Sequence, residues 1–129
     1  MEKKQIEEMI DLAIRQMDYS YVPYSHFHVG AALLAKNGTY YTGCNIENSS
    51  YGATICAERT AMAKAVSEGR KDMVKIAIVS SLADKTYPCG ICRQVMAEFM
   101  PKGSIVLKDK EGKITEETVE SLLPKAFSL

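Results

Sequence analysis

The sequence lacks an excess of charge of one sign, a secretory signal and any apolar run long enough to cross a membrane. Lys plus Arg number 16 and Asp plus Glu number 16, so no basic surplus is available to neutralise phosphates. The start, Met1-Glu2-Lys3-Lys4-Gln5, has lysines but no apolar segment after them, and no run approaches the ~18–20 apolar residues of a membrane span. These absences predict a soluble cytoplasmic protein that binds neither nucleic acid nor a membrane.

The length and composition predict a single globular domain over residues 1–129. The chain is 47% hydrophobic and 25% charged, which lies in the range of folded proteins and outside the disordered classes. It contains 4 cysteines, and without a secretory signal these indicate reduced thiols, metal ligands or redox chemistry rather than a disulfide scaffold. The function of the cysteines is therefore the main question.

Hydrophobic periodicity and turn residues predict the order of the elements. The expected segments are a helix over 5–17, strands over 27–36 and 39–46 joined at Asn37-Gly38, a helix over 56–66, a strand over 73–81, a helix over 89–100, a strand over 104–108 and a short helix capped by Thr118. The strand over 73–81 is continuously apolar, as expected at the centre of a sheet covered on both faces. The sum predicts a three-layer α/β domain.

The cysteines fall into two clusters, each at the start of a predicted helix. Cys56 opens one helix, and Cys89 and Cys92 open the next. Unpaired N–H groups and the helix dipole favour thiolates at such positions. The two-residue spacing lets both sulfurs of the second cluster bind one ion, as in tetrahedral zinc sites. If the two helices begin at the same edge of the sheet, Cys56 completes a three-thiolate set whose fourth position is open for water.

Glu58 lies two residues after Cys56, close to the expected ion but on another side of the first helical turn. This position suits a proton carrier rather than a ligand, because a zinc ion acidifies its bound water and a neighbouring carboxylate can accept that proton. Three thiolates give the site a formal negative charge that weakens this effect. Arg59 and Arg93, next to the two clusters, can withdraw some of that charge.

Cys56-Ala57-Glu58 followed by Pro88-Cys89-Gly90-Ile91-Cys92 resembles the signature of zinc-dependent nucleoside and nucleotide deaminases. The resemblance extends over nearly the whole chain, through the segments 22–25, 27–32, 43–48, 56–59, 88–94 and 122–127. The chain looks like the small, homotetrameric type of cytidine deaminase. This implies a three-layer α/β/α sandwich with a mixed sheet of about five strands. It also implies one Zn²⁺ per subunit and hydrolytic deamination of cytidine and 2′-deoxycytidine to uridine and 2′-deoxyuridine plus ammonia, in pyrimidine salvage.

The resemblance also implies a role for individual residues. It assigns zinc binding to Cys56, Cys89 and Cys92, proton transfer to Glu58, ribose binding to Asn45 and Glu47, packing on the pyrimidine to Phe27, base binding to the backbone of Ala57, tuning of the thiolates to Arg59 and pocket closure to Phe127 from a neighbouring subunit. A neutral nucleoside needs no cluster of Arg or Lys, which agrees with the charge balance.

Three other functions remain open at this stage. An aminonucleoside-antibiotic deaminase, of the blasticidin S type, would share the zinc motifs. Cys89-Gly90-Ile91-Cys92 also resembles the dithiol of a thiol-disulfide oxidoreductase. In a structural zinc-binding module, Cys44 would supply a fourth thiolate, since closed four-cysteine sites are usually structural.

Overall fold

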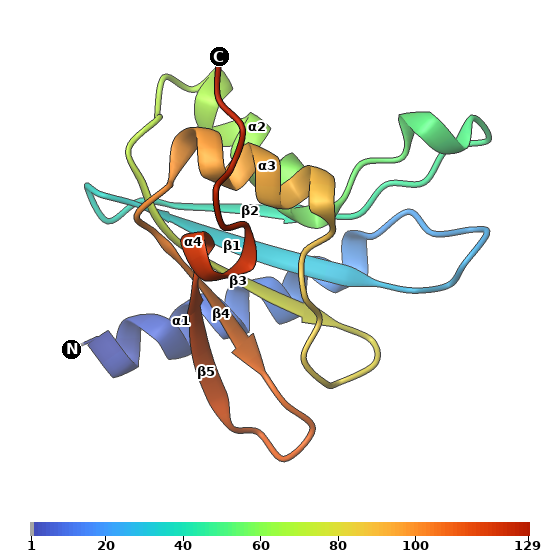
Figure 1. Ribbon diagram of the computed structural model, residues 1–129. Helices are drawn as coiled ribbons and strands as arrows, with labels where there is room; N and C mark the ends of the chain where they lie inside the picture. The colour runs from blue at the N-terminus through green and yellow to red at the C-terminus, as the bar shows by residue number, and fades with distance from the viewer. Residues whose placement is uncertain (1) are drawn as a thin grey trace.

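The computed structural model describes residues 2–129, which form five strands, four α-helices and two 3₁₀ turns (Figure 1). In chain order these are α1 (Glu2–Gln16), η1 (Met17–Tyr19), β1 (Val29–Ala35), β2 (Tyr40–Cys44), η2 (Tyr51–Ala53), α2 (Ala57–Ser67), β3 (Met73–Ser80), α3 (Gly90–Phe99), β4 (Ser104–Lys108), β5 (Ile114–Thr118) and α4 (Val119–Leu122). Among these residues, no helix combines the length and the apolar character needed to span a membrane.

The five strands form one mixed sheet in the order β2-β1-β3-β4-β5. β1 is antiparallel to β2 and β3, β3 is parallel to β4, and β4 is antiparallel to β5. The predicted hairpin at Asn37-Gly38 is confirmed, with Gly38 at a φ of 91°. The parallel pair needs a crossover, and α3 provides it. β3, whose apolar run from Met73 to Val79 is interrupted only by Lys75, lies at the centre of the sheet as predicted.

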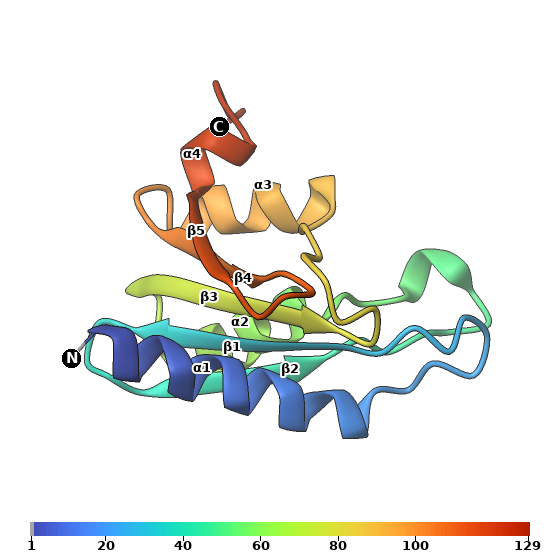
Figure 2. The same cartoon turned by 90° about the horizontal axis from the view of Figure 1, so that it is seen from below.

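Helices cover both faces of the sheet, which confirms the predicted three-layer α/β/α architecture. Figure 2 shows α1 along one side of the sheet and α3 along the other. The side chains of β1 alternate between the two layers: Leu33 packs with α2 and α3, whereas Leu34 packs with α1. The apolar run of this strand therefore serves two cores at once.

The structure differs from the sequence prediction at β5 and at the start of β1. The periodicity indicates four strands, and only the family resemblance implies about five. β5 carries polar side chains on an edge, where no apolar alternation is required. The first strand begins at Val29 rather than at Phe27, so Phe27 lies in the irregular segment that precedes the sheet. Thr118 caps α4 as predicted, and its Oγ1 accepts a hydrogen bond from Ser121 N at 3.1 Å.

Two glycines allow helices to approach strands closely. A Cβ added to Gly30 in β1 would lie 1.9 Å from the carbonyl oxygen of Ala13 in α1. A Cβ added to Gly43 in β2 would lie 2.5 Å from both Ala57 O and Ala61 N in α2. Both helices therefore rest on strand backbone, which only glycine permits at these distances. The second contact positions the first turn of α2.

A buried ammonium group connects three elements on the α1 face. The side chain of Lys75 in β3 is 9% exposed, and Nζ donates to Glu2 Oε2 at 3.0 Å and to Glu116 Oε2 at 2.8 Å. Ser104 Oγ donates to the same Glu116 oxygen at 2.7 Å. Burial opposes the charged form of Lys75, but the hydrogen bonds to the two carboxylates raise its pKa above the usual value. The cluster joins β5 and α1 to the central strand.

We expect Glu116→Gln to destabilise the protein by about 1–2 kcal/mol at neutral pH, because Lys75 would lose a charged partner in a mostly buried position. Burial raises the pKa of Glu116, but hydrogen bonds from Lys75 and Ser104 lower it more, to below its ordinary 4.5. A depressed pKa in the folded state gives stability that is present above about pH 4.5 and is lost as the pH falls through the folded-state value. Urea unfolding of both proteins at several pH values should therefore show a difference that shrinks in acid. A difference that is independent of pH would contradict this account.

Candidate active site

α2 and α3 begin at the same end of the sheet, each with a cysteine at its N-cap (Figure 1). Cys56 and Cys89 have extended backbones, with φ/ψ of −72°/154° and −70°/170°. Their carbonyls accept the first helical hydrogen bonds, from Thr60 N at 3.1 Å and Arg93 N at 3.0 Å. Because the N–H groups of a first helical turn have no partner within the helix, both cysteines lie where anions are stabilised.

The sulfur atoms of Cys56, Cys89 and Cys92 all lie within 4.8 Å of one another. Cys56 Sγ and Cys89 Sγ are 3.7 Å apart. Two thiolates on one tetrahedral zinc, each ~2.3 Å from the ion, would be about 3.8 Å apart. Cys92 is fully buried and Cys89 is exposed, so the cluster reaches from the core to the surface. The donor set and its spacing fit a zinc ion.

Arg59 provides positive charge beside the cluster. Its Nη2 lies 3.7 Å from Cys56 Sγ and 3.4 Å from Thr54 O. A hydrogen bond from the Cys92 thiol, aided by Arg59, lowers the pKa of Cys56 to about 5. The same hydrogen bond, together with burial, raises the pKa of Cys92. The pair therefore favours a thiolate on Cys56, which is the form that binds metals.

Arg93 does not occupy the position suggested for it beside the thiols. Its Nε donates to Pro88 O at 2.8 Å and its Nη1 donates to Leu122 O at 2.9 Å. The guanidinium thus ties the segment before α3 to the end of α4. Being adjacent to Cys92 in sequence does not direct the side chain toward the sulfurs, because the helix turns it to another side.

Glu58 is buried in the first turn of α2, with 4% of its surface exposed. Burial, together with the negative charge of Cys56, raises the pKa of this carboxyl to about 7. A carboxyl group with such a pKa can both accept and release a proton near neutrality. An ordinary glutamate in the first turn of a helix is exposed and ionised. The burial of Glu58 therefore makes it a candidate for acid–base chemistry.

Asn45, directly after β2, holds the backbone around Phe27. Its Nδ2 donates to Phe27 O at 2.8 Å, and its Oδ1 accepts from Val29 N at 3.0 Å. The side chain of Phe27 packs against the same hydrophobic core cluster as Cys56 does. The amide of Asn45 keeps one further N–H for a ligand, since each bond uses one of its donors or lone pairs.

Glu47 lies beside a surface cavity of about 290 Å³ whose lining consists of Tyr24, Ser25, Glu47, Tyr51 and Thr54. Its Oε1 accepts from Tyr24 N at 3.0 Å and Ser25 N at 3.2 Å, and its Oε2 accepts from Ser25 Oγ. The hydrogen bond from Ser25 is the main cause of a lowered pKa at Glu47. None of the described residues in this lining is basic, so the cavity offers no cation to a phosphate.

The remaining predicted residues occupy distinct environments. Ala57 is fully buried and is the first residue of α2, so its N–H has no partner within the helix. Cys44 ends β2, is buried, and is outside the sulfur cluster formed by the described residues. Phe127 is 68% exposed in the C-terminal segment, and its carbonyl accepts from Gln94 Nε2 at 2.9 Å.

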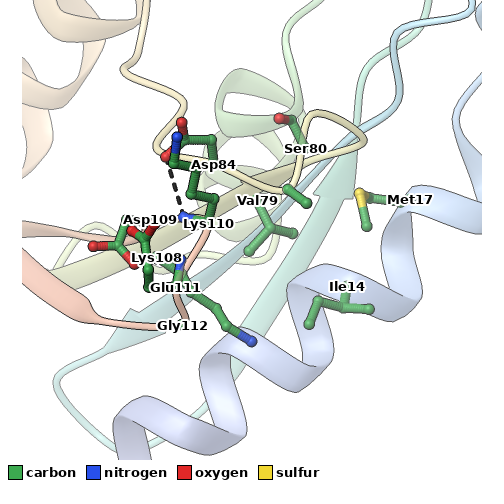
Figure 3. Close-up of a pocket in the computed structure, with 11 residues that line it drawn as sticks. Ile14, Met17, Val79, Ser80, Asp84, Lys108, Asp109, Lys110, Glu111 and Gly112 are labelled. Atoms are coloured by element: carbon green, nitrogen blue, oxygen red, sulfur yellow. Dashed lines mark hydrogen bonds between the residues drawn. The ribbon is translucent and has the colours of Figure 1, made fainter.

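A second cavity, of about 410 Å³, lies on the α1 side of the sheet (Figure 3). Ile14, Met17 and Val79 form its apolar part, and charged residues of the β4–β5 turn form its rim. Lys110 N donates to Asp84 Oδ1 at 3.2 Å across the rim. The sheet separates this cavity from the sulfur atoms. The chemistry of the side chains therefore places the candidate active site at the N-terminal ends of α2 and α3, where the cysteines lie.

Ser25 and Tyr24 surround Glu47 in the structure, although the sequence predicts only loop packing for Tyr24 and no role for Ser25. Tyr24 also contacts the loop after β2: its hydroxyl lies 2.6 Å from Ser49 Oγ, and its ring lies edge-on to that of Tyr51, with centroids 6.2 Å apart. Both residues fall within the segment 22–25 that carries part of the family resemblance. That segment was the available signal, although their spacing of more than 20 residues from Glu47 hides the contact.

Comparisons with known proteins agree with these features. Residues 3–108 match the model of the cytidine and deoxycytidylate deaminase zinc-binding region. A cytidine deaminase of Halalkalibacterium halodurans is 54% identical over 121 residues, which cover 93% of this chain and 92% of that protein. The crystal structure of cytidine deaminase from Burkholderia pseudomallei superposes with a TM-score of 0.88 at 40% identity, covering 94% of this chain and 98% of that one. A blasticidin-S deaminase of Bacillus cereus is 33% identical over 129 residues, covering 94% and 91%. The chain therefore belongs to the cytidine and deoxycytidylate deaminase family.

Proposed function

We propose that this chain catalyses the zinc-dependent hydrolytic deamination of cytidine and 2′-deoxycytidine to uridine and 2′-deoxyuridine plus ammonia. The observation that carries the proposal is the meeting of three cysteine sulfurs, all within 4.8 Å, beside the buried carboxyl of Glu58. The similarity to proteins named cytidine deaminase supports the substrate. We assign the enzyme to pyrimidine salvage in the cytoplasm, where the free thiols of the cluster stay reduced.

Cys56, Cys89 and Cys92 would hold one Zn²⁺ per chain. When bound, the ion supplies a Lewis acid that activates water for attack on the C4 carbon of the pyrimidine. Arg59, with Nη2 3.7 Å from Cys56 Sγ, withdraws negative charge from the three-thiolate set. The chain thereby limits the loss of acidity that three thiolates would otherwise cause.

Glu58 would carry the proton through the reaction. As C4 becomes tetrahedral, negative charge develops on ring N3, which must gain a proton. The carboxyl of Glu58 takes one proton from the attacking water and delivers it to N3, and later takes the second proton from the C4 hydroxyl and passes it to the departing amine. Ammonia then leaves as the C4 carbonyl of uridine forms. A single carboxyl suffices because its buried position keeps it from bulk water.

The sugar and the base would be bound by the segments around Asn45 and Glu47. The free N–H of Asn45 and the remaining lone pair of Glu47 suit ribose hydroxyls, particularly the 3′-hydroxyl. Phe27 would pack on the pyrimidine, and the N–H of Ala57 would bind the base. The absence of a basic residue among those that line the cavity beside Glu47 favours a nucleoside over a nucleotide.

We infer a homotetramer in which Phe127 closes the active site of a neighbouring subunit. Its 68% exposure, on a terminal segment beside α3, supports a contact outside its own chain. Light scattering combined with activity measurements tests this assembly, and a fully active monomer would contradict it.

An ultraviolet absorbance assay tests the proposed reaction. Adding cytidine or 2′-deoxycytidine to the zinc-loaded protein is expected to decrease the absorbance as the base loses its amine, with release of one ammonia per nucleoside. Blasticidin S serves as the competing substrate, because the similarity to a blasticidin-S deaminase keeps that activity as the alternative. Turnover of blasticidin S without turnover of cytidine would overturn the substrate assignment.

A further inference from the structure

Two loops that carry the proposed nucleoside-binding residues lie side by side beyond the end of the sheet (Figure 2). Tyr21 N donates to Asn45 O at 3.0 Å, and Glu47 N donates to Tyr21 O at 2.8 Å. The first loop then turns sharply at His26, which has a φ of 58° and donates its N–H to Val22 O at 3.0 Å. This turn brings residues 24–27 back toward the side chain of Glu47.

Ser25 bonds to both loops through a single hydroxyl group. Its Oγ donates to Glu47 Oε2 and accepts from Phe27 N at 3.0 Å. A serine hydroxyl has one proton to donate and two lone pairs, so it can make both bonds at once. The carboxylate proposed to bind the sugar and the backbone of the residue proposed to pack on the base are thus joined by one atom.

The side chain of Asn45 completes the arrangement from the other side of Phe27. Ser25 Oγ binds the N–H of Phe27, and Asn45 Nδ2 binds its carbonyl at 2.8 Å. Both polar groups of the Phe27 backbone are therefore hydrogen-bonded to side chains of the proposed sugar site. One is Asn45, which is proposed to bind the sugar, and the other is Ser25, which contacts Glu47. The same two side chains therefore connect the sugar-binding pair to the backbone that carries the aromatic ring.

We propose that Ser25 is a positioning residue that couples recognition of the sugar hydroxyls by Glu47 to the placement of Phe27 against the base. The inference rests on the proposed function and deepens it by naming a residue that sets nucleoside specificity. Without this hydroxyl, Glu47 Oε2 and Phe27 N lose their common partner, and the carboxylate is held only at Oε1, by Tyr24 N and Ser25 N.

The test combines Ser25→Ala with a substrate that lacks the sugar hydroxyls in question. For cytidine, we expect KM to rise about tenfold, as loss of one hydrogen bond to a charged group implies, with kcat changed by less than about threefold. For 2′,3′-dideoxycytidine, which has no hydroxyl for Glu47 to bind, the same substitution should raise KM only about two- to threefold, because only the placement of Phe27 against the base is then disturbed. Dissociation constants of uridine and 2′,3′-dideoxyuridine, measured by calorimetry, should show the same contrast.

Two variants separate this role from general loosening of the loops. Ser25→Thr keeps the hydroxyl, so its KM for cytidine should be close to the wild-type value. Ser49→Ala removes a hydroxyl that contacts Tyr24 across the same two loops, and should leave the ratio between the two substrates unchanged. An equal penalty on both substrates, or no penalty, would overturn the role of Ser25 while leaving the proposed function in place. A wild-type protein without cytidine turnover would overturn both.

Discussion

Replacing Glu58 with glutamine is expected to lower kcat for cytidine about 10²–10⁴-fold, the usual contribution of a positioned acid–base group. Glutamine has nearly the same shape as glutamate but cannot accept a proton from water or deliver one to ring N3. Because Glu58 is buried and 4% exposed, no solvent-borne buffer can easily replace it. Initial rates at saturating cytidine measure the effect. Bound zinc per chain, measured by mass spectrometry, should not change.

Glu120 provides the matched control. It also lies in the first turn of a helix, α4, but its side chain is exposed. Glu120→Gln should therefore leave kcat, KM and the zinc content at wild-type values. If Glu58→Gln retained more than about a tenth of the wild-type kcat, the carboxyl would have no part in proton transfer, and its burial would need another explanation.

Removing the buried thiol of Cys92 is expected to abolish both metal binding and activity. Cys92→Ala leaves two sulfur donors, those of Cys56 and Cys89, where three would hold the ion. Affinity for zinc should fall at least about a hundredfold, more than the loss of an outer-shell partner causes. Dialysis against a weak chelator followed by metal analysis should give about one zinc per wild-type chain and well below that for the variant.

Cys44→Ala is the control for that experiment and also tests the structural zinc-binding module. Cys44 is buried at the end of β2, where burial raises the pKa of its thiol. Its replacement should leave zinc content and cytidine turnover unchanged. Loss of zinc on replacing Cys44 would support a closed four-cysteine site instead. If the protein reduced disulfide substrates after its metal had been removed with a chelator, that result would support the thiol-disulfide oxidoreductase function.

The fold was predictable from sequence wherever local patterns determine it. The apolar run of β3 and the Asn37-Gly38 turn each contain their own signal, and both elements form as predicted. β5 was not predictable in this way. Its residues pair with β4 and bind Lys75, and the bond between Lys75 and Glu116 joins positions 41 residues apart. β4 and β5 form a local hairpin, but the β5 residues Ile-Thr-Glu-Glu-Thr show no apolar alternation, so hydrophobic periodicity does not predict the strand.

The residues of the candidate site likewise differ in whether a local pattern predicts them. The sequence spacing predicts the metal-ligating group, because zinc binding itself requires thiols at such intervals near helix starts. This applies to Cys56, Cys89 and Cys92, and the spacing also predicts Glu58, two residues after the first of them. Ser25 was not predicted, because its hydrogen bond to Glu47 depends on the turn at His26, and a positive φ is uncommon for any residue but glycine, although histidine adopts it more often than most. The direction of Arg93 was equally hidden, since its partner Leu122 lies 29 residues away.

The contact of α2 with the backbone at Gly43 has a consequence for how this protein tolerates change. Ala57 O and Ala61 N would both lie 2.5 Å from a Cβ at Gly43, so the helix turn that bears Glu58 rests on peptide groups, whose dimensions do not vary with sequence. Side chains that differ in volume, such as Met62, meet the sheet from later turns of the helix. We therefore expect changes in side-chain volume there to shift the far end of α2 more than its first turn, so that the carboxyl of Glu58 keeps its position relative to the sheet while the core residues around the later turns vary.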